Sequence, residues 1–157
     1  MALFKQIRRL AYLAVVTVFA FIDMNDAGLS RRTFEFFTFK HNLPVVEDRM
    51  LRTTSSLESD IKAYVEEFIL GPVSVDFAPL ITKGTKLQSF MFRNGTVYAD
   101  FSGEAVLPIP GGQPLFDGFL ALNLGIRRNF PSVTGVKLFV NGNEVFFGEF
   151  LKIFSAD

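Results

Sequence analysis

"TKLQSFMFRNGTVYADFSGE", residues 85–104, has the outline of a β-hairpin, with an apolar-rich run on each side of Asn94-Gly95. Asn-Gly is a strong two-residue turn signal, because both central residues of such a turn need positive φ. Directly paired residues share a face. We therefore expect one face in the core, made of Phe90, Phe92, Val97, Ala99 and Phe101. The other face is mixed and carries Leu87, Ser89, Met91, Arg93, Tyr98 and Asp100.

A second Asn-Gly pair, Asn141-Gly142, repeats this pattern in residues 134–150. The expected core face carries Val136, Leu138, Val140, Val145 and Phe147. The opposite face carries Lys137, Phe139, Glu144 and Phe146. Both predicted hairpins therefore have large side chains on the face that does not belong to the core.

Two amphipathic helices are predicted among these β segments. In residues 53–72, Ser55 and Glu58 have capping-box spacing and Gly71-Pro72 stops the helix. Its apolar stripe is Leu57, Ile61, Tyr64, Val65 and Phe68. The second helix follows Pro114 and ends at Pro131. Its stripe is Leu115, Phe119, Leu122, Ile126 and Phe130. Gly118 and Gly125 within it indicate close packing.

The remaining segments complete the predicted fold. Residues 31–40 are rich in β formers and predict a strand, whereas residues 41–52 have no clean period and read as a connector. Helices of this kind need an apolar sheet face to cover. We therefore predict one α+β domain over residues 31–157, with the order β-α-β-β-α-β-β. In this two-layer sandwich, two helices lie on one face of a mixed or antiparallel sheet.

Residues 1–30 differ from the rest of the chain. Lys5, Arg8 and Arg9 precede an uncharged, mostly apolar run from Leu10 to Ile22. As a helix this run reaches about 20 Å, short of the roughly 30 Å hydrocarbon core. It resembles the apolar part of a secretory signal, and neither of its cleavage options is good. We predict a signal peptide or an uncleaved signal anchor, with the domain outside the cytoplasm. A buried segment of a cytosolic domain is the alternative.

The composition restricts the chemistry. The chain of 157 residues has no Cys, which excludes disulfides, thiol catalysis, Cys-ligated zinc and a lipid-modified Cys. His41 is the single His and lies in a predicted loop. Lys+Arg and Asp+Glu are 16 each, and this balance disfavours a nucleic-acid surface. We expect no catalytic residues, no cofactor, no metal and no nucleic-acid partner. The alternative is a ligand-binding or hydrolytic domain that uses Asp100, Glu104 and Asp117 near the loop of residues 105–114.

Four motifs resemble those of the GerMN domain family, named for sporulation and spore-germination proteins. They are Leu70-Gly71-Pro72, Gly84-Thr85-Lys86-Leu87, Val97 to Ser102 and Val136 to Gly142. Together they cover roughly residues 33–150 in the family's order. The resemblance implies a non-enzymatic assembly or interaction module of the bacterial envelope, exported and membrane-anchored. We expect the chain in the bacterial inner membrane, or secreted if the signal is cleaved. The pathway stays open, because such domains also resemble parts of envelope proteins in bacteria that make no spores.

The mixed faces of the two hairpins supply a candidate interaction surface. If the helices cover the other face, then Met91, Tyr98, Phe139 and Phe146 point away from them. Large apolar side chains on an otherwise polar sheet face are typical of a binding surface. We hypothesise that this surface contacts another envelope protein or a second copy of the chain. The alternative is that residues 41–52 or residues 150–157 cover it.

Overall fold

The computed structural model describes residues 12–14, 28–41, 43–109 and 115–145. The elements follow in this order: β1 (Gly28–Thr38), β2 (Pro44–Thr53), α2 (Leu57–Leu70), β3 (Phe77–Ala78), β4 (Leu87–Arg93), β5 (Thr96–Phe101), the 3₁₀ helix η1 (Gly103–Val106), α3 (Leu115–Asn129), β6 (Gly135–Val140) and β7 (Asn143–Val145). The predicted α+β class is confirmed, with two helices on one face of a mixed sheet. The strands β2 and β3 are additional to the predicted order, and with β1 they form a second sheet.

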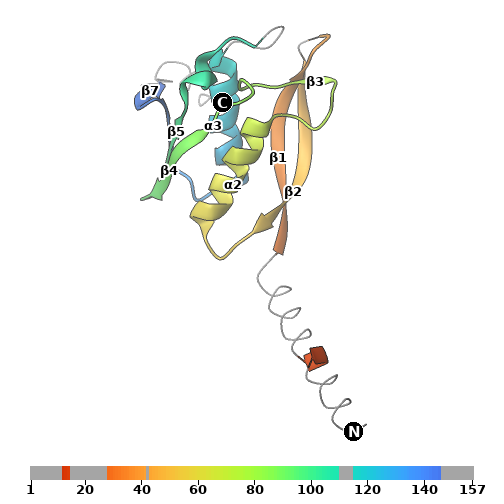
Figure 1. Cartoon of the computed structure of the whole chain (residues 1–157), viewed down its shortest axis with the longest axis vertical. Helices are drawn as coiled ribbons and strands as arrows, with labels where there is room; N and C mark the ends of the chain where they lie inside the picture. Colours follow the sequence, from red (N-terminus) through yellow and green to blue (C-terminus); the bar gives the residue numbers. More distant parts are fainter. Residues whose placement is uncertain (1–11, 15–27, 42, 110–114, 146–157) are drawn as a thin grey trace.

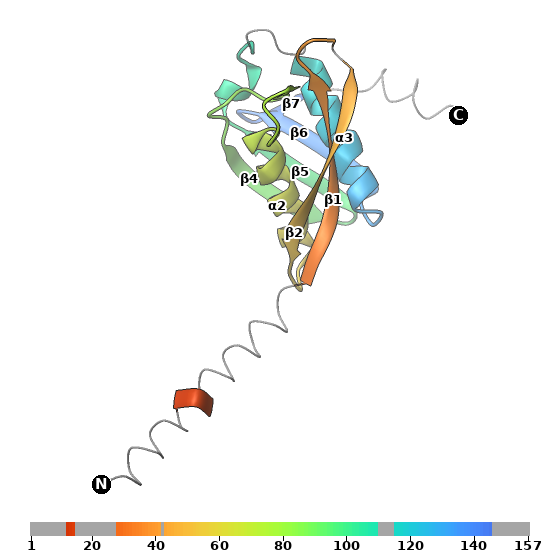
Figure 2. The same ribbon diagram turned by 90° about the vertical axis from the view of Figure 1, so that its right-hand side faces the viewer.

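The described strands form two sheets with the two long helices between them (Figure 1). The four-stranded sheet has the order β4-β5-β6-β7; β5 and β6 are parallel, and the other neighbours are antiparallel. The second sheet has the order β2-β1-β3. Figure 2 looks onto the β1–β2 hairpin, which lies in front of α2 and α3. The hairpin thus covers the side of the helices that the four-stranded sheet leaves open.

The two Asn-Gly turns are formed as predicted. Asn94 and Gly95 have φ of 51° and 76°, and Asn141 and Gly142 have φ of 48° and 77°. The register of the first hairpin includes Met91 opposite Tyr98. The buried residues of β5 and β6 are Val97, Ala99, Phe101, Leu138 and Val140. The predicted core faces are therefore correct where the structure describes them. Leu87 of the predicted mixed face packs against the core instead, because the register shifts between Leu87 and Ser89. Phe147 lies outside the described residues.

The start of α2 differs from the prediction by one residue. The N-cap is Ser56, whose side chain accepts the backbone N–H of Ser59 at 3.3 Å. Asp60 accepts the backbone N–H of Thr54 at 2.7 Å. The Ser55–Glu58 capping box is therefore wrong. The Glu58 carboxylate instead accepts the backbone N–H of Phe92 on β4 at 3.3 Å, so a long-range contact replaces the predicted local one.

The two glycines of α3 lie at close contacts. A Cβ at Gly118 would lie 2.1 Å from the carbonyl oxygen of Leu80, and one at Gly125 would lie 2.3 Å from the hydroxyl of Tyr64. Real Cβ atoms essentially never come within 3.0 Å of such neighbours. The absence of side chains at these positions therefore lets α3 approach α2 and the segment after β3, as the sequence indicates.

The prediction of a connector over residues 41–52 is wrong, because Pro44–Thr53 is a strand paired with β1. Its inward face carries Glu47 and Arg49 as well as apolar residues. The sequence of β2 therefore does not show the alternation of apolar and polar residues that is typical of a half-buried strand. The Arg49 guanidinium lies over the Phe34 ring, 4.7 Å from its centroid. Its ion pair to Glu47 is 2.6 Å long, and its ion pair to Glu67 of α2 is 3.0 Å long. Pairing lets two charged side chains point inward.

Candidate functional site

Met91, Tyr98 and Phe139 lie on the face of the four-stranded sheet that points away from the helices. This follows from the alternation of β5 and β6, whose intervening residues are buried. Met91 is directly opposite Tyr98. Phe139 is opposite Asp100, two residues along β5 from Tyr98. Met91 is exposed and the two aromatic side chains are partly exposed. We call these three residues the outer sheet surface.

Polar and charged groups border the outer sheet surface. Lys137 is opposite Tyr98 and forms a 3.2 Å ion pair with Glu144. The two carboxylate oxygens of Asp100 accept the backbone N–H of Gly142 at 3.1 and 3.2 Å. An apolar centre with a charged border is the usual composition of a protein–protein contact.

One of the two segments expected to cover this surface lies elsewhere. Residues 44–53 form β2, which pairs with β1 on the opposite side of the helices (Figure 1). The other segment, residues 150–157, is outside the described residues, and so is Phe146. The β1–β2 hairpin therefore leaves Met91, Tyr98 and Phe139 uncovered.

The carboxylates of the alternative hypothesis are Asp100, Glu104 and Asp117. Within the described ranges, no group of three or more His, Asp or Glu side chains is arranged to hold a metal ion. Asp100 binds the Gly142 turn, whereas Asp117 lies in the first turn of α3. The Ser102 hydroxyl, followed by the backbone of Glu104 itself, lowers the pKa of the Glu104 carboxyl. Glu104 thus lies in the first turn of η1. His41, the single histidine, is exposed in the turn after β1.

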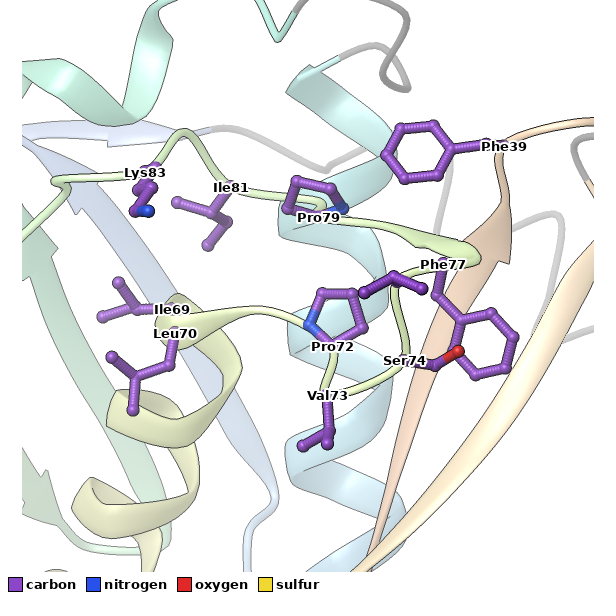
Figure 3. A pocket seen from close by; sticks show the side chains of 11 residues that line it. Phe39, Ile69, Leu70, Pro72, Val73, Ser74, Phe77, Pro79, Ile81 and Lys83 are labelled. Atoms are coloured by element: carbon purple, nitrogen blue, oxygen red, sulfur yellow. The ribbon is translucent and has the colours of Figure 1, made fainter.

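The structure also contains a pocket of about 350 Å³ at the C-terminal end of α2, which was not predicted from the sequence. We call it the α2-end pocket. Figure 3 shows Lys83 on one side with Ile69 and Leu70, and Phe39 and Phe77 on the other. The lining is apolar except for Ser74 and Lys83. The alternation of the apolar residues Val73, Val75 and Phe77 in the stretch "VSVDF" is the sequence pattern that could have indicated this pocket.

Three backbone contacts hold the loop that forms one wall of this pocket. The Arg49 guanidinium donates to the carbonyl of Gly71 at 2.6 Å. The Glu47 carboxylate accepts the backbone N–H of Val73 at 3.1 Å. At the other end of the loop, the backbone carbonyl of Asp76 accepts the backbone N–H of Phe39 at 3.2 Å. The inward charges of β2 thus position the wall of the α2-end pocket.

The sequence and the structure were compared with known proteins. The profile of the family described as "Germane: Sporulation and spore germination" matches residues 36–146. The tandem GerMN domains of the sporulation protein GerM from Bacillus subtilis match with 20% identity and a TM-score of 0.53, over 76% of this chain and 40% of that one. The first GerMN domain of GerM matches with 23% identity and a TM-score of 0.51, over 72% and 85%. No curated protein matches significantly.

Proposed function

The chain belongs to the Germane family of sporulation and spore germination proteins, and we propose that it is a non-enzymatic interaction module of the bacterial envelope. Its partner is another envelope protein or a second copy of the chain. The outer sheet surface carries this proposal, because the β1–β2 hairpin leaves it uncovered. Phe146, on the same predicted face, extends the proposed surface.

The proposed location of the protein in the cell depends on the N-terminal sequence. We propose that residues 1–30 are a signal peptide or signal anchor and that residues 31–157 are the exported domain. The basic residues before the apolar run favour a domain outside the cytoplasm. In the part of the chain that the structure describes, no helix has the length and apolarity needed to span a bilayer. Most of the apolar run, residues 15–22 included, is outside that part.

Photocrosslinking in cells tests the outer sheet surface. A photoreactive residue replaces Phe139 in the full chain, and a matched one replaces Lys62, which is exposed on α2. We expect a discrete adduct at position 139 in the membrane fraction and none at position 62. Folded protein in the membrane fraction without an adduct at position 139 would contradict the proposal.

A substitution gives a second, independent readout. Phe139→Ser removes a partly exposed aromatic ring whose neighbours on β6, Leu138 and Val140, form the core instead. We expect normal folding and loss of the adduct formed by a photoreactive residue at Met91. Unchanged partner capture by Phe139→Ser would show that this surface is not the contact.

A further inference from the structure

The three most exposed large apolar side chains of the described residues lie together at the α2-end pocket. Leu70 is 77% exposed, Val73 is 79% exposed and Val75 is 90% exposed, and all three line it with Phe39. Single exposed apolar side chains are ordinary on protein surfaces, whereas a contiguous group is typical of a contact site. This group belongs neither to the core nor to the outer sheet surface.

The pocket is preorganised. The loop after α2 is bonded at Gly71, Val73 and Asp76, as described above. Below it, Ile81 and Leu80 are buried in the core. The exposed valines are therefore held on a fixed backbone, so a partner would lose little free energy in ordering the site.

The charged residues at the pocket indicate which charge a bound partner should carry. Lys83 lines one end, and Lys40 follows Phe39 at the other end. Neither lysine forms an ion pair within the described residues. Asp76 is the one acidic residue of the loop from 71 to 77. Glu47, whose carboxylate accepts the N–H groups of Val73 and Ser74, is neutralised by its ion pair with Arg49. Among the described residues that line the pocket, Lys83 is the one that carries a charge, so a carboxylate on the occupant would complement it.

The position of the pocket favours a protein over a lipid. Gly28 begins β1 at the end of the proposed anchor, whereas Phe39 comes directly after the other end of β1. An extended strand of this length spans about 35 Å. In a chain anchored through residues 1–30, the pocket is therefore remote from the membrane surface. Of the observations at this pocket, only its distance from the membrane depends on the proposed anchoring.

We propose that the α2-end pocket binds a short segment of a partner protein, which inserts apolar side chains beside Leu70, Val73 and Val75 and places a carboxylate against Lys83. The site is distinct from the outer sheet surface. The two proposals are therefore tested by different substitutions, and either can fail alone.

Binding of labelled peptides tests this assignment. The full chain is placed in phosphatidylcholine nanodiscs and titrated with two pools of fluorescent peptides of about 12 residues, a length sufficient to cross one pocket. Both pools vary two positions among Leu, Ile, Val and Phe. One pool carries Asp or Glu beside them, and the other carries Lys. Fluorescence anisotropy reports binding. We expect the acidic pool to bind about tenfold more tightly than the basic pool.

Four variants, two in the pocket and two controls outside it, test whether the peptides bind at the pocket. Val75→Asp should weaken binding of the acidic pool by about tenfold or more, and Lys83→Glu should reverse the preference between the pools. Val46→Asp is the matched control, because Val46 is an exposed valine on the far face of β2. It should leave binding unchanged. Phe139→Ser should also leave it unchanged, which separates this site from the outer sheet surface.

Any one of the following results would overturn the proposal. The first is no binding of either pool up to about 1 mM, the affinity of a very weak contact. The second is equal binding of both pools, or binding that Val75→Asp does not affect. The third is self-association in analytical ultracentrifugation that Val75→Asp abolishes, since the occupant would then be a second copy. The fourth is cosedimentation with phosphatidylglycerol vesicles that Val75→Asp abolishes, since the occupant would then be a lipid.

Discussion

The side-chain amide of Asn129 binds both backbone groups of Thr33. Its oxygen accepts the Thr33 N–H at 2.9 Å, and its nitrogen donates to the Thr33 carbonyl at 2.8 Å. These backbone groups point away from β2, and β3 pairs with β1 only at Phe37 and Thr38. An amide at the end of α3 therefore takes the place of a neighbouring strand along an otherwise unpaired stretch of β1.

The first prediction concerns this amide. Asn129→Ala removes three hydrogen bonds, because Asn129 also donates to the carbonyl of Gly125 at 2.9 Å. We expect the free energy of unfolding to fall by about 1–3 kcal/mol, since the partly buried N–H of Thr33 loses its partner and the Thr33 carbonyl keeps only its bond from the Tyr64 hydroxyl among the described residues. Urea denaturation measures it.

The matched control is Asn143→Ala. Among the described residues, the amide of Asn143 donates to the carbonyls of Val140 and Asn141 alone, at the long distances of 3.5 and 3.3 Å. Its removal should change the free energy of unfolding by less than about 0.5 kcal/mol. Equal effects of Asn129→Ala and Asn143→Ala would show that the Thr33 contact does not stabilise the fold.

The second prediction concerns Gly125→Ala. Alanine favours a helix by about 1 kcal/mol over glycine, but its Cβ would lie 2.3 Å from the Tyr64 hydroxyl oxygen. Overpacking in a core usually costs about 1–3 kcal/mol. We therefore expect Gly125→Ala to lower the free energy of unfolding, or at best to leave it unchanged, in urea denaturation.

A double-mutant cycle identifies the cause of that effect. In a Tyr64→Phe background the offending oxygen is absent, and the next nearest atom, the ring carbon Cζ, is 3.3 Å away. Gly125→Ala should then be neutral or stabilising, which gives a coupling energy between the two sites. The same loss of stability in both backgrounds would exclude the Tyr64 hydroxyl as its cause.

The parts of the fold that were predicted correctly depend on short-range chemistry. Asn94-Gly95 and Asn141-Gly142 need positive φ, which fixes the turn and so the register of each hairpin. Pro114 and Pro131 bracket α3, and Gly118 and Gly125 indicate its close contacts. Met91, Tyr98 and Phe139 could be placed on one face for the same reason, because register alone determines which residues share a face.

The parts that were missed depend on contacts between distant residues. β2 has Glu47 and Arg49 on its inward face. Arg49 contacts Glu67 of α2 and the carbonyl of Gly71, and Glu47 accepts the N–H of Val73 in the loop after α2. Charged residues at inward positions remove the apolar–polar alternation that identifies a strand in a sequence, and their partners cannot be recognised from the sequence alone. The α2-end pocket was missed for a related reason. Its walls come from Phe39, from the end of α2 and from residues 72–83, and no local pattern brings these segments together.

The third prediction concerns alkaline pH. Burial, the largest cause, raises the pKa of the Tyr64 phenol, against weaker opposing effects of Asn129 and Arg128. An unfolded tyrosine loses its proton near pH 10. Above that pH the unfolded state releases a proton that the folded state keeps. The contribution of Tyr64 to stability is therefore complete below about pH 10 and is lost as the pH rises toward the folded-state pKa.

Tyr64→Phe isolates this contribution. Urea midpoints between about pH 9 and pH 11 should fall more steeply for the original chain than for the variant, because only the original chain has the buried phenol. Phenolate absorbance gives a second measurement, in which one of the three tyrosines should titrate late, and Tyr64→Phe should remove it. Parallel urea profiles would contradict the assignment.

The fourth prediction concerns Arg49, whose side chain is 10% exposed. Arg49→Met removes its ion pairs with Glu47 and Glu67 and its bond to the Gly71 carbonyl. Breaking a buried ion pair by removing one partner typically costs about 3–5 kcal/mol. We expect a loss in this range in urea denaturation. Arg128→Met is the matched control, because the Arg128–Glu35 pair is largely exposed, and its loss should cost less than about 1 kcal/mol.

Two further measurements separate the loss of an ion pair from the loss of packing. Adding Glu47→Gln to Arg49→Met should recover part of the stability, because it removes the unpaired carboxylate that Arg49→Met leaves behind. Hydrogen exchange should show faster opening at Val73 and Ser74, whose N–H groups bind the Glu47 carboxylate. If the double substitution is less stable and these amides exchange as before, the Arg49–Glu47 pair does not hold the wall of the α2-end pocket. The preorganisation of that pocket would then need another source.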